Sequence, residues 1–368
     1  MYTKYLTEPT LILDRNKCKK NISLMAGKAI QNQLIFRPHF KTHQSRAVGK
    51  WFAEAGVEKI TVSSVKMAEY FANDNWKDIT VAFPVNIREI KSINELAEEI
   101  QLNLTIENTE SINYLKNKLK FPVGYFIKID TGYHRTGVDA KNFQLIDKLL
   151  STAALSDHLL FRGFLVHSGD TYHAGNPREI NRIFYHTVDQ LKNLKHRYLK
   201  DYPQMILSIG DTPSCSLVHD FRSVDEIRPG NFVFYDLMQY KLGTCSFNEI
   251  AVVVACPVVA IHPERKEIII HGGAVHFSKD YLDIDGQKIY GQALTLNSKG
   301  WQKPVEPVYL TKLSQEHGTI QATEKFLQSI RVGDMIGVIP VHSCLTANLM
   351  RSYFTTDNDT LDHLSGQE

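Results

Sequence analysis

The segment FRPHFKTHQS, residues 36–45, places one lysine, Lys41, between two histidines just after a short apolar run. A lysine in such a segment can be a solvated loop residue, as most lysines are. It can also form a Schiff base with a carbonyl compound, which requires a strand-end position and neighbours that disfavour its protonated form. The segment by itself leaves both interpretations open.

Arg135 lies in KIDTGYHRTGV, residues 128–138, between Gly132 and Gly137. The Asp-Thr-Gly part of this segment is typical of a turn that closes a strand. A guanidinium just beyond such a turn could bind a ligand's oxygen or phosphate. An arginine in a loop is more often structural, so the segment is not decisive.

Two turns rich in small residues follow later, SIGDTPSC at 208–215 and EIRPGNFVFYD at 226–236. Both offer backbone N–H groups at predicted strand ends, which is how parallel barrels hold a phosphate. Glycine-containing turns are common, and each is weak evidence alone. Two of them after successive late strands have the arrangement that a barrel phosphate site requires.

The segment PVHSCLTANLM, residues 340–350, contains His342 and Cys344. On a strand these alternating residues would point to the same face. Imidazole and thiolate together suit Zn²⁺. Two ligands are too few for a closed structural site, but they could form an open catalytic one. The alternative is a buried free cysteine beside a core histidine.

The elements that must position these residues follow a repeating pattern. Eight short apolar or β-branched runs recur at 33–41, 59–64, 78–84, 102–107, 123–130, 161–169, 204–211 and 224–231. Stretches with helical spacing separate most of them, which predicts a parallel (β/α)8 barrel with its site at the carboxyl ends of the strands. After about residue 240 the chain is rich in strand-like runs without intervening helices, which predicts a second, mostly β domain.

Composition narrows the class of protein. The 368 residues carry 42 basic and 40 acidic side chains, a formal charge of +2 that gives no reason to expect binding to nucleic acid or to an anionic membrane. No apolar run is long enough to cross a bilayer, and the N-terminus MYTKYLTEPT lacks the apolar centre of a signal peptide. Five cysteines without a CxxC pair indicate the reduced cytoplasm.

Taken in order, RPHFKTH, DTGYHRTGV, HSGDTY, GDTPSC, RPGNFVFYD and HSCLT resemble the D-threonine aldolase and D-serine dehydratase family. Its members are pyridoxal-phosphate enzymes with the alanine-racemase fold. The resemblance extends from the N-terminus to residue 350. It implies a barrel over roughly 15–240, a β domain formed by 1–14 together with 241–368, and a homodimer.

The resemblance also assigns roles by position. Lys41 matches the lysine that binds pyridoxal phosphate covalently, and Tyr172 matches a tyrosine near the reacting substrate. His342 and Cys344 match the metal pair, which usually binds zinc. The remaining cofactor contacts are Arg135 near the phenolic oxygen, His167 at the pyridine ring, and a phosphate cradle of Asp211, Thr212, Gly230 and Asn231 with Tyr235 close after it.

One position helps to choose a reaction. D-Threonine aldolases tend to carry a carboxylate where this chain has Cys344, whereas the dehydratases tend to carry cysteine. The resemblance therefore predicts a pyridoxal-phosphate- and metal-dependent lyase that dehydrates D-serine, or a related D-3-hydroxy amino acid, to a 2-oxo acid and ammonia. Hydroxyaspartate aldolases share the cysteine, so cleavage to glycine and an aldehyde stays open. The metal pair argues against simple racemisation, because a racemase has no β-substituent to activate.

Two alternatives belong to other classes of protein. A non-enzymatic pyridoxal-phosphate-binding protein would share the lysine and the phosphate turns, but it would have no use for a second domain with a metal pair. A metal-dependent barrel hydrolase could instead use the strand-end histidines His39, His43, His134 and His167. That alternative predicts a colourless protein that stays active when Lys41 is replaced by alanine.

Overall fold

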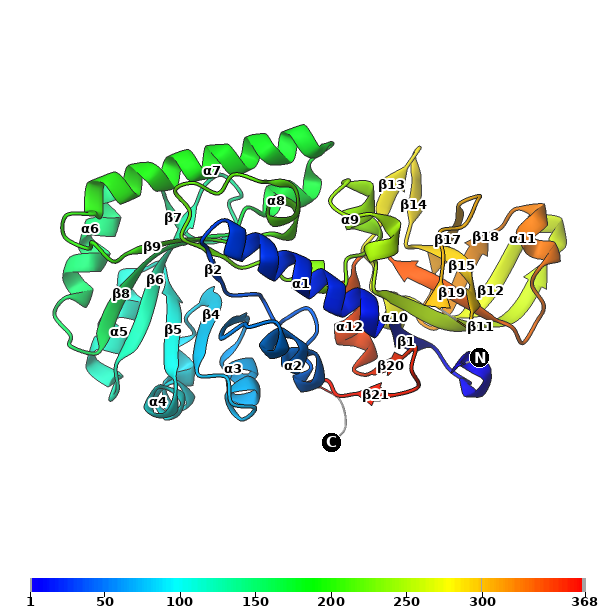
Figure 1. Ribbon diagram of the computed structural model, residues 1–368, viewed down its shortest axis with the longest axis horizontal. Helices are drawn as coiled ribbons and strands as arrows, with labels where there is room; N and C mark the ends of the chain where they lie inside the picture. The colour runs from blue at the N-terminus through cyan, green and yellow to red at the C-terminus, as the bar shows by residue number, and fades with distance from the viewer. Residues whose placement is uncertain (1, 299, 366–368) are drawn as a thin grey trace. The chain divides into compact units, whose positions relative to one another are not determined.

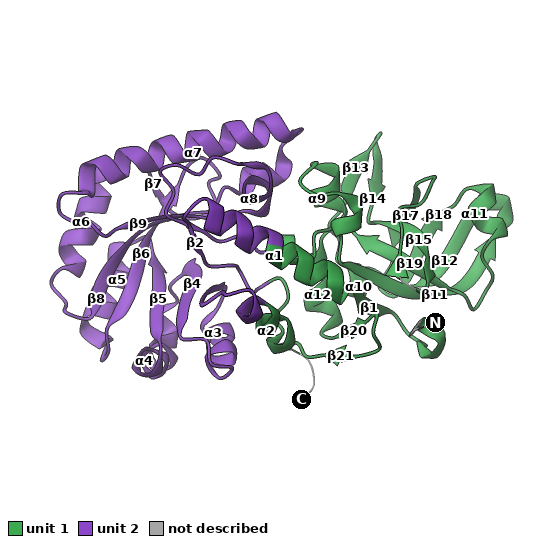
Figure 2. Cartoon of the chain, in the orientation of Figure 1, with its two compact units in different colours: residues 1–23, 42–51, 231–368 green, residues 24–41, 52–230 purple. Residues whose placement is uncertain are grey.

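The computed structural model describes residues 2–298 and 300–365. Contacts divide the chain into two compact units, drawn in separate colours in Figure 2. Unit 1 contains residues 1–23, 42–51 and 231–368, and unit 2 contains residues 24–41 and 52–230. The chain therefore passes from unit 2 to unit 1 directly after Lys41, and again directly after Gly230.

Unit 2 contains an eight-stranded parallel barrel (Figure 1). Its strands are β2 (Ile35–Phe36), β3 (Lys59–Val62), β4 (Asp78–Pro84), β5 (Gln101–Ile106), β6 (Val123–Asp130), β8 (Leu159–Val166), β9 (Ile206–Ile209) and β10 (Glu226–Ile227). They pair in the order β2-β10-β9-β8-β6-β5-β4-β3, always in parallel. A parallel bridge between His39 and Thr61 joins the segment after β2 to β3 and closes the ring. The predicted (β/α)8 barrel is confirmed.

Helices connect these parallel strands, as crossover connections require. They are α3 (Val65–Ala72), α4 (Ile90–Glu99), α5 (Thr109–Lys118), α6 (Phe143–Ala153), α7 (Pro177–Tyr198) and α8 (Thr212–Leu217), whereas α1 (Arg15–Gln31) and α2 (Arg46–Glu54) contain residues of both units. Side chains at their starts satisfy the first free N–H groups: Ser64 accepts from Met67 N, and Asn176 accepts from Arg178 N and Glu179 N.

A network of buried polar side chains crosses the barrel interior. Arg37 Nη1 lies 2.6 Å from Asp78 Oδ1, and Arg37 Nε lies 2.7 Å from Glu226 Oε2. Glu226 accepts in turn from Ser208 Oγ at 2.6 Å. Removing one partner of such a pair leaves an uncompensated buried charge, which costs about 3–5 kcal/mol. This network of polar side chains thus fixes the relative positions of β2, β4, β9 and β10.

Lys41 follows a strongly anchored aromatic residue. The Phe40 side chain is fully buried, and its ring centroid lies 4.9, 4.9 and 5.0 Å from those of Phe52, Phe71 and Trp76. Truncating a core phenylalanine to alanine costs about 3–5 kcal/mol. The aromatic cluster therefore holds the main chain at the position where Lys41 begins.

Unit 1 is built on a ten-stranded sheet. Its strands include β1 (Thr10–Leu13), β11 (Val252–His262), β12 (Glu267–His271), β15 (Gly291–Asn297), β16 (Gly300–Trp301), β17 (Val308–Leu313), β18 (His317–Gln321), β19 (Met335–Pro340), β20 (Tyr353–Thr355) and β21 (Thr360–Leu361). Six of them close into a ring, β12-β18-β17-β15-β19-β11, because β11 also pairs with β12. The predicted second β domain is confirmed, and a separate hairpin joins β13 (Leu282–Ile284) to β14 (Gln287–Ile289).

The expectation that no helices follow residue 240 was wrong. Short helices are present at α10 (Ala274–Phe277), α11 (Glu324–Gln328) and α12 (Ser343–Met350), and α9 (Leu237–Lys241) precedes them. Most span about one turn, too short for a helical repeat of apolar residues to be visible in the sequence. In the described part of the chain, no helix combines the length and the apolar composition that a membrane span needs.

Residues 42–51 associate with unit 1 through hydrogen bonds to the C-terminal part of the chain. Ser45 Oγ donates to Asp362 Oδ1 at 2.9 Å, and Tyr353 Oη donates to His43 O at 2.5 Å. The division by contacts therefore separates this segment from the barrel, whereas the boundaries expected from the sequence kept it within one continuous barrel region.

The buried His43 predicts a specific loss of stability in acid. Burial lowers the pKa of His43 to about 3, and its Nδ1 accepts from Ser45 N at 3.1 Å. An unfolded histidine titrates near pH 6.5, so below that pH the unfolded chain takes up a proton that the folded chain refuses. This contribution to stability is complete above about pH 6.5 and falls by up to about 1.4 kcal/mol per pH unit down to about pH 3.

We therefore expect His43→Gln to lessen the decrease in unfolding free energy between pH 7.5 and pH 5, measured by urea denaturation. Glutamine keeps an acceptor for Ser45 N but has no titrating group. His173→Gln, at an exposed position, is the matched control and should keep the wild-type decrease. Identical pH dependence in wild type and His43→Gln would contradict the assignment.

Candidate active site

Basic side chains gather at the carboxyl ends of the barrel strands in unit 2. His39 follows β2, Lys128 lies in β6, His167 follows β8 and Arg228 follows β10. Burial, together with repulsion from Arg228 and Arg135, lowers the pKa of Lys128 to about 7. Burial and the neighbouring cations also hold the pKa values of His39 and His167 well below the usual range. An anionic ligand would relieve this accumulation of positive charge.

Arg228 and Lys128, which are each only 4% exposed, are not among the site residues predicted from the sequence. Arg228 Nε donates to Ser208 Oγ at 2.6 Å, and Arg228 Nη2 donates to Val166 O at 2.5 Å. Ser208 belongs to the network of polar side chains through Glu226, so the barrel interior holds this guanidinium in place. The available signal was a basic residue within a predicted strand or just after it, in KIDTG and EIRPGN.

The His167 imidazole has a defined orientation. Its Nδ1 lies 2.5 Å from Gly210 O, and because a carbonyl only accepts, Nδ1 carries the proton. The low pKa then leaves Nε2 as an unprotonated acceptor. The rings of Tyr133 and Tyr172 lie nearby, with centroids 6.1 and 6.2 Å from the imidazole. This histidine is suited to contact a planar ligand or to accept a proton.

Lys41 and Arg135 are both exposed and both act electrostatically on His167. Lys41 also lowers the pKa of His39, and its backbone N–H donates to His39 Nδ1 at 3.4 Å. The Arg135 guanidinium lies 5.3 Å from the centre of the Tyr133 ring. The structure thus brings three predicted site residues, Lys41, Arg135 and His167, to one end of the barrel.

Asp211 and Thr212 form the start of α8. Asp211 Oδ1 accepts from Ser214 N at 2.7 Å and from Thr171 Oγ1 at 3.0 Å, while burial raises the pKa of Asp211 to about 6. Thr212 N donates to Tyr172 Oη at 3.1 Å. Tyr172 therefore lies against the predicted phosphate cradle, and an anion could receive the Thr212 N–H only if this phenol moved.

The predicted metal pair lies in unit 1 at a turn between strand and helix. The expectation that His342 and Cys344 alternate along a strand was wrong, because β19 ends at Pro340 and α12 begins at Ser343 with His342 as its N-cap residue. The isolated pattern His-x-Cys cannot distinguish two strand positions from a cap and the first turn of a helix. The two side chains nevertheless come into contact.

His342 is held by a carboxylate. Its Nδ1 lies 2.8 Å from Asp280 Oδ2, which leaves Nε2 to bind a metal. Burial alone would lower the pKa of His342, but the hydrogen bonds with Asp280 and Cys344 outweigh it and raise that pKa to about 10. An imidazole nitrogen supported by a carboxylate, next to a cysteine sulfur, is a donor set that fits a zinc-like cation.

Two further side chains contact the sulfur of Cys344. Thr42 Oγ1 lies 3.2 Å from Sγ, and Asn231 Nδ2 lies 3.6 Å from it. Asn231 Nδ2 also donates to Asp236 Oδ2 at 2.6 Å and to Ser343 Oγ at 3.1 Å. The side chain expected at the phosphate cradle thus points its amide nitrogen at the metal pair.

Tyr235 closes the same turn. Its side chain is buried, its backbone adopts a left-handed φ of 50°, and its N–H donates to Asn231 O at 2.7 Å. A left-handed tyrosine is unusual and persists only where the surroundings impose it. The turn therefore holds Asn231 and Tyr235 in a defined arrangement within unit 1.

Covalent connections link the two predicted sites. Lys41 is bonded to Thr42, and Gly230 is bonded to Asn231. Thr42 and Asn231 are the two residues that contact the sulfur of Cys344 through a hydroxyl and an amide. Each of the two passages from unit 2 to unit 1 thus joins a residue expected at the cofactor to a residue that touches the predicted metal ligand.

The alternative of a barrel hydrolase gains no support. Within residues 2–298 and 300–365, the four histidines proposed as its ligands do not form a group of three neighbouring ligands. His43 lies in unit 1 rather than in the barrel, and the exposed His134 pairs with Asp130 at 3.0 Å.

A different cluster of potential ligands, missed in the sequence, lies in unit 1. The donor atoms of His271, His276 and Glu316 lie within 4.8 Å of one another. His276 Nδ1 accepts from Gly273 N at 3.1 Å, so the neutral ring carries its proton on Nε2. If a metal bound at Nε2, the neutral ring would carry its proton on Nδ1, and Nδ1 could no longer accept from Gly273 N. This arrangement therefore favours a helix cap over a metal site.

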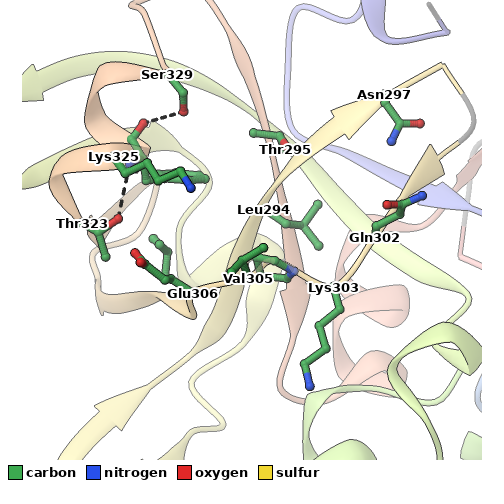
Figure 3. A pocket seen from close by; sticks show the side chains of 13 residues that line it. Leu294, Thr295, Asn297, Gln302, Lys303, Val305, Glu306, Thr323, Lys325 and Ser329 are labelled. Atoms are coloured by element: carbon green, nitrogen blue, oxygen red, sulfur yellow. Dashed lines mark hydrogen bonds between the residues drawn. The ribbon is translucent and has the colours of Figure 1, made fainter.

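A cavity of about 340 Å³ in unit 1 contains none of the predicted site residues (Figure 3). Leu294 and Val305 give it apolar walls, and Lys325 and Glu306 lie at its sides. Lys303, also in its lining, donates to Tyr240 Oη at 2.6 Å. The lining brings together no group of metal ligands and no nucleophile with a base, so it is not a candidate active site.

Comparison with known proteins gives a consistent result. Residues 13–237 match the model of the alanine racemase N-terminal domain, and residues 251–356 match that of a putative serine dehydratase domain. A D-serine dehydratase from Dictyostelium discoideum is 32% identical over 382 residues, covering 96% of this chain and 94% of that protein. The chain belongs to the D-serine dehydratase family.

Other proteins similar to this family member differ in activity. A 3-hydroxy-D-aspartate aldolase from Paracoccus denitrificans is 23% identical, covering 96% of this chain and 89% of its own. The solved structure of D-threo-3-hydroxyaspartate dehydratase from Delftia sp. HT23 is 24% identical and covers 99% of both chains, with a TM-score of 0.89. At that identity the solved structure supports the fold alone. A cysteine-to-alanine variant of the same dehydratase has been solved in a metal-free form.

The Asp280–His342 contact leads to a prediction about metal binding by this D-serine dehydratase family member. We expect Asp280→Asn to weaken binding of Zn²⁺ by about 10- to 100-fold, because carboxylates that orient a ligating histidine typically contribute this much. Competition with a chromophoric chelator measures the affinity. Asp283→Asn, at the exposed position of β13, is the control and should bind Zn²⁺ like the wild type. Equal affinity in all three proteins would exclude this role for Asp280.

Proposed function

We propose that this chain is a pyridoxal-phosphate- and divalent-metal-dependent lyase that converts D-serine, or a related D-3-hydroxy amino acid, to a 2-oxo acid and ammonia. The observation that carries the proposal is the link between Lys41 and the metal pair. Lys41 is bonded to Thr42, whose hydroxyl lies 3.2 Å from Cys344 Sγ. Lys41 would hold the cofactor, and its neighbour in the chain, Thr42, contacts Cys344, which would hold the metal.

The residues of unit 2 fit pyridoxal phosphate. The cofactor carries a phosphate and its substrate carries a carboxylate, and the cluster around Lys128, His167 and Arg228 has an excess of positive charge for such anions. Lys41 supplies an exposed primary amine for the aldehyde. Arg135 and His167 would contact the ring, and the segments at Asp211–Thr212 and Gly230–Asn231 would approach the phosphate.

The residues of unit 1 fit a divalent cation. His342 Nε2 and Cys344 Sγ would hold it, and we propose zinc because imidazole and thiolate are the ligands that zinc prefers among the common divalent ions. Asp280 fixes the histidine, and Asp236 accepts from Ser343 N at 2.9 Å, which fixes the turn between the two ligands.

When bound, the cofactor supplies an electron sink for the carbanion at Cα, and the cation supplies a Lewis acid for the departing hydroxyl. Lys41 Nζ accepts the proton from Cα. The buried cations Lys128 and Arg228 would orient the substrate carboxylate. Loss of water gives an enamine, and its hydrolysis gives the 2-oxo acid and ammonia. Tyr172, which lies between His167 and Thr212, would shield this end of the barrel from solvent.

The same residues could direct a second reaction, cleavage of Cα–Cβ to glycine and an aldehyde. The similarity to a 3-hydroxy-D-aspartate aldolase favours this second candidate. The higher identity to a D-serine dehydratase, 32% over 96% of the chain, favours dehydration. The products distinguish the two reactions directly.

Two properties stay predictions, a homodimer and a cytoplasmic location. Both follow from the family resemblance and from the composition of the chain. Light scattering of the purified protein tests the first, and fractionation of the source cells tests the second.

The central prediction concerns Lys41. We expect the purified protein to absorb near the edge of the visible range, as lysine-bound pyridoxal phosphate does, to release pyruvate from D-serine, and to lose this activity with a chelator and regain it with Zn²⁺. Lys41→Ala should lose the absorbance band and lower kcat by at least about 1,000-fold, since the lysine both holds the cofactor and moves the proton.

Lys50→Ala removes a different exposed lysine and is the matched control, which should keep both absorbance and activity. A colourless protein that does not take up the cofactor would overturn the proposal. Release of acetaldehyde and glycine from D-threonine, without pyruvate from D-serine, would move the chain to the aldolases. Bound cofactor without turnover of either substrate would favour a binding protein.

A further inference from the structure

We propose that Thr42 is a positioning residue that acts on the metal through the sulfur of Cys344. Its hydroxyl donates a hydrogen bond to this sulfur and thereby limits the electron density that the sulfur gives to the metal. The proposal rests on the proposed role of His342 and Cys344 as metal ligands. It assigns to Thr42 a task that the resemblance did not assign to any residue.

The contact is short and buried. Thr42 Oγ1 lies 3.2 Å from Cys344 Sγ, well within hydrogen-bonding range for sulfur. The Thr42 side chain is completely buried, and Cys344 is only 9% exposed. A hydrogen bond in such surroundings is electrostatically stronger than one in water, because little solvent competes for either atom.

The direction of this hydrogen bond follows from the chemistry of the ligand. A cysteine that binds a metal does so as a thiolate, which has no proton to donate. The hydroxyl of Thr42 must then be the donor. Asn231 Nδ2, at 3.6 Å, adds a longer contact on the same sulfur.

The second donor is fixed by a buried carboxylate. Asp236 Oδ2 accepts from Asn231 Nδ2 at 2.6 Å and from Ser343 N at 2.9 Å. Asp236 Oδ1 also accepts from Gln239 N at 2.9 Å, so the carboxylate itself is held. The surroundings of the sulfur are therefore preorganised rather than adjustable.

The consequence for the metal follows from charge. A thiolate whose lone pairs are engaged by hydrogen bonds gives less electron density to the cation, and the cation keeps more of its positive charge. Such a cation is a stronger Lewis acid toward a departing hydroxyl. Thr42 would thus adjust the reactivity of the metal without touching the substrate.

Co²⁺ is the probe for this effect, because a thiolate bound to Co²⁺ gives a charge-transfer absorbance band. Chelator-treated holoenzyme is titrated with Co²⁺, and the spectrum before addition is subtracted to remove the cofactor's absorbance. We expect Thr42→Val to shift the band to longer wavelength, because losing the hydrogen bond raises the energy of the sulfur lone pairs. Thr42→Ser keeps the hydroxyl and should restore the wild-type position.

The zinc-loaded variants give a second readout. We expect kcat for pyruvate formation to fall about 10-fold in Thr42→Val and KM to change little, as for loss of one interaction with a metal ligand. A purely structural role for Thr42 would change stability but leave the band in place. If Thr42→Val does not fold, Thr42→Ala replaces it in both measurements.

The outcomes separate this inference from the proposed function. A Co²⁺ band at the same wavelength in Thr42→Val and the wild type would overturn the role of Thr42 and leave the metal site intact. Absence of any Co²⁺–thiolate band in the wild type would overturn the metal site itself, whatever the Thr42 variants do.

Discussion

The concentration of positive charge at the carboxyl ends of the barrel strands is the constraint on which the candidate site depends. Lys128 and Arg228 are almost fully buried, and the half-buried His39 and His167 lie close enough to be affected by them. Burying charges of one sign is unfavourable unless a ligand of the opposite sign compensates them. This end of the barrel would therefore suit the anionic ligand proposed for it, and the exposed Lys41 lies near His39 and His167.

Side chains in the barrel interior hold these basic residues in place. Arg37, Glu226, Ser208 and Arg228 form a continuous chain of ion pairs and hydrogen bonds through the barrel interior. Because removal of Arg37 or Glu226 would leave a buried charge uncompensated, this network of side chains holds the strand ends in one register. The aromatic cluster around Phe40 does the same for the main chain before Lys41 by packing rather than by charge.

The covalent path of the chain relates the two units chemically. It leaves the barrel after Lys41 and again after Gly230, and on both occasions the next residue contacts Cys344. Thr42 and Asn231 would therefore neighbour a metal at the proposed ligands His342 and Cys344, and each directly follows in the chain a residue that is proposed to hold the cofactor. The segment 42–51 interrupts the barrel sequence but belongs to unit 1, because it forms hydrogen bonds with the C-terminal part of the chain.

The sequence by itself determined the barrel, the second β domain and the family, because alternating apolar runs and spaced motifs are local patterns. It also predicted that Lys41, Arg135 and His167 belong to one site, and the structure brings these three residues to one end of the barrel. Only the tertiary structure placed His342 and Cys344 at a turn between strand and helix, since the same two residues fit either backbone. It alone revealed Lys128, Arg228, Asp280 and the donors to Cys344, because their roles come from partners that are distant in the sequence, and spacing carries no information about such pairs.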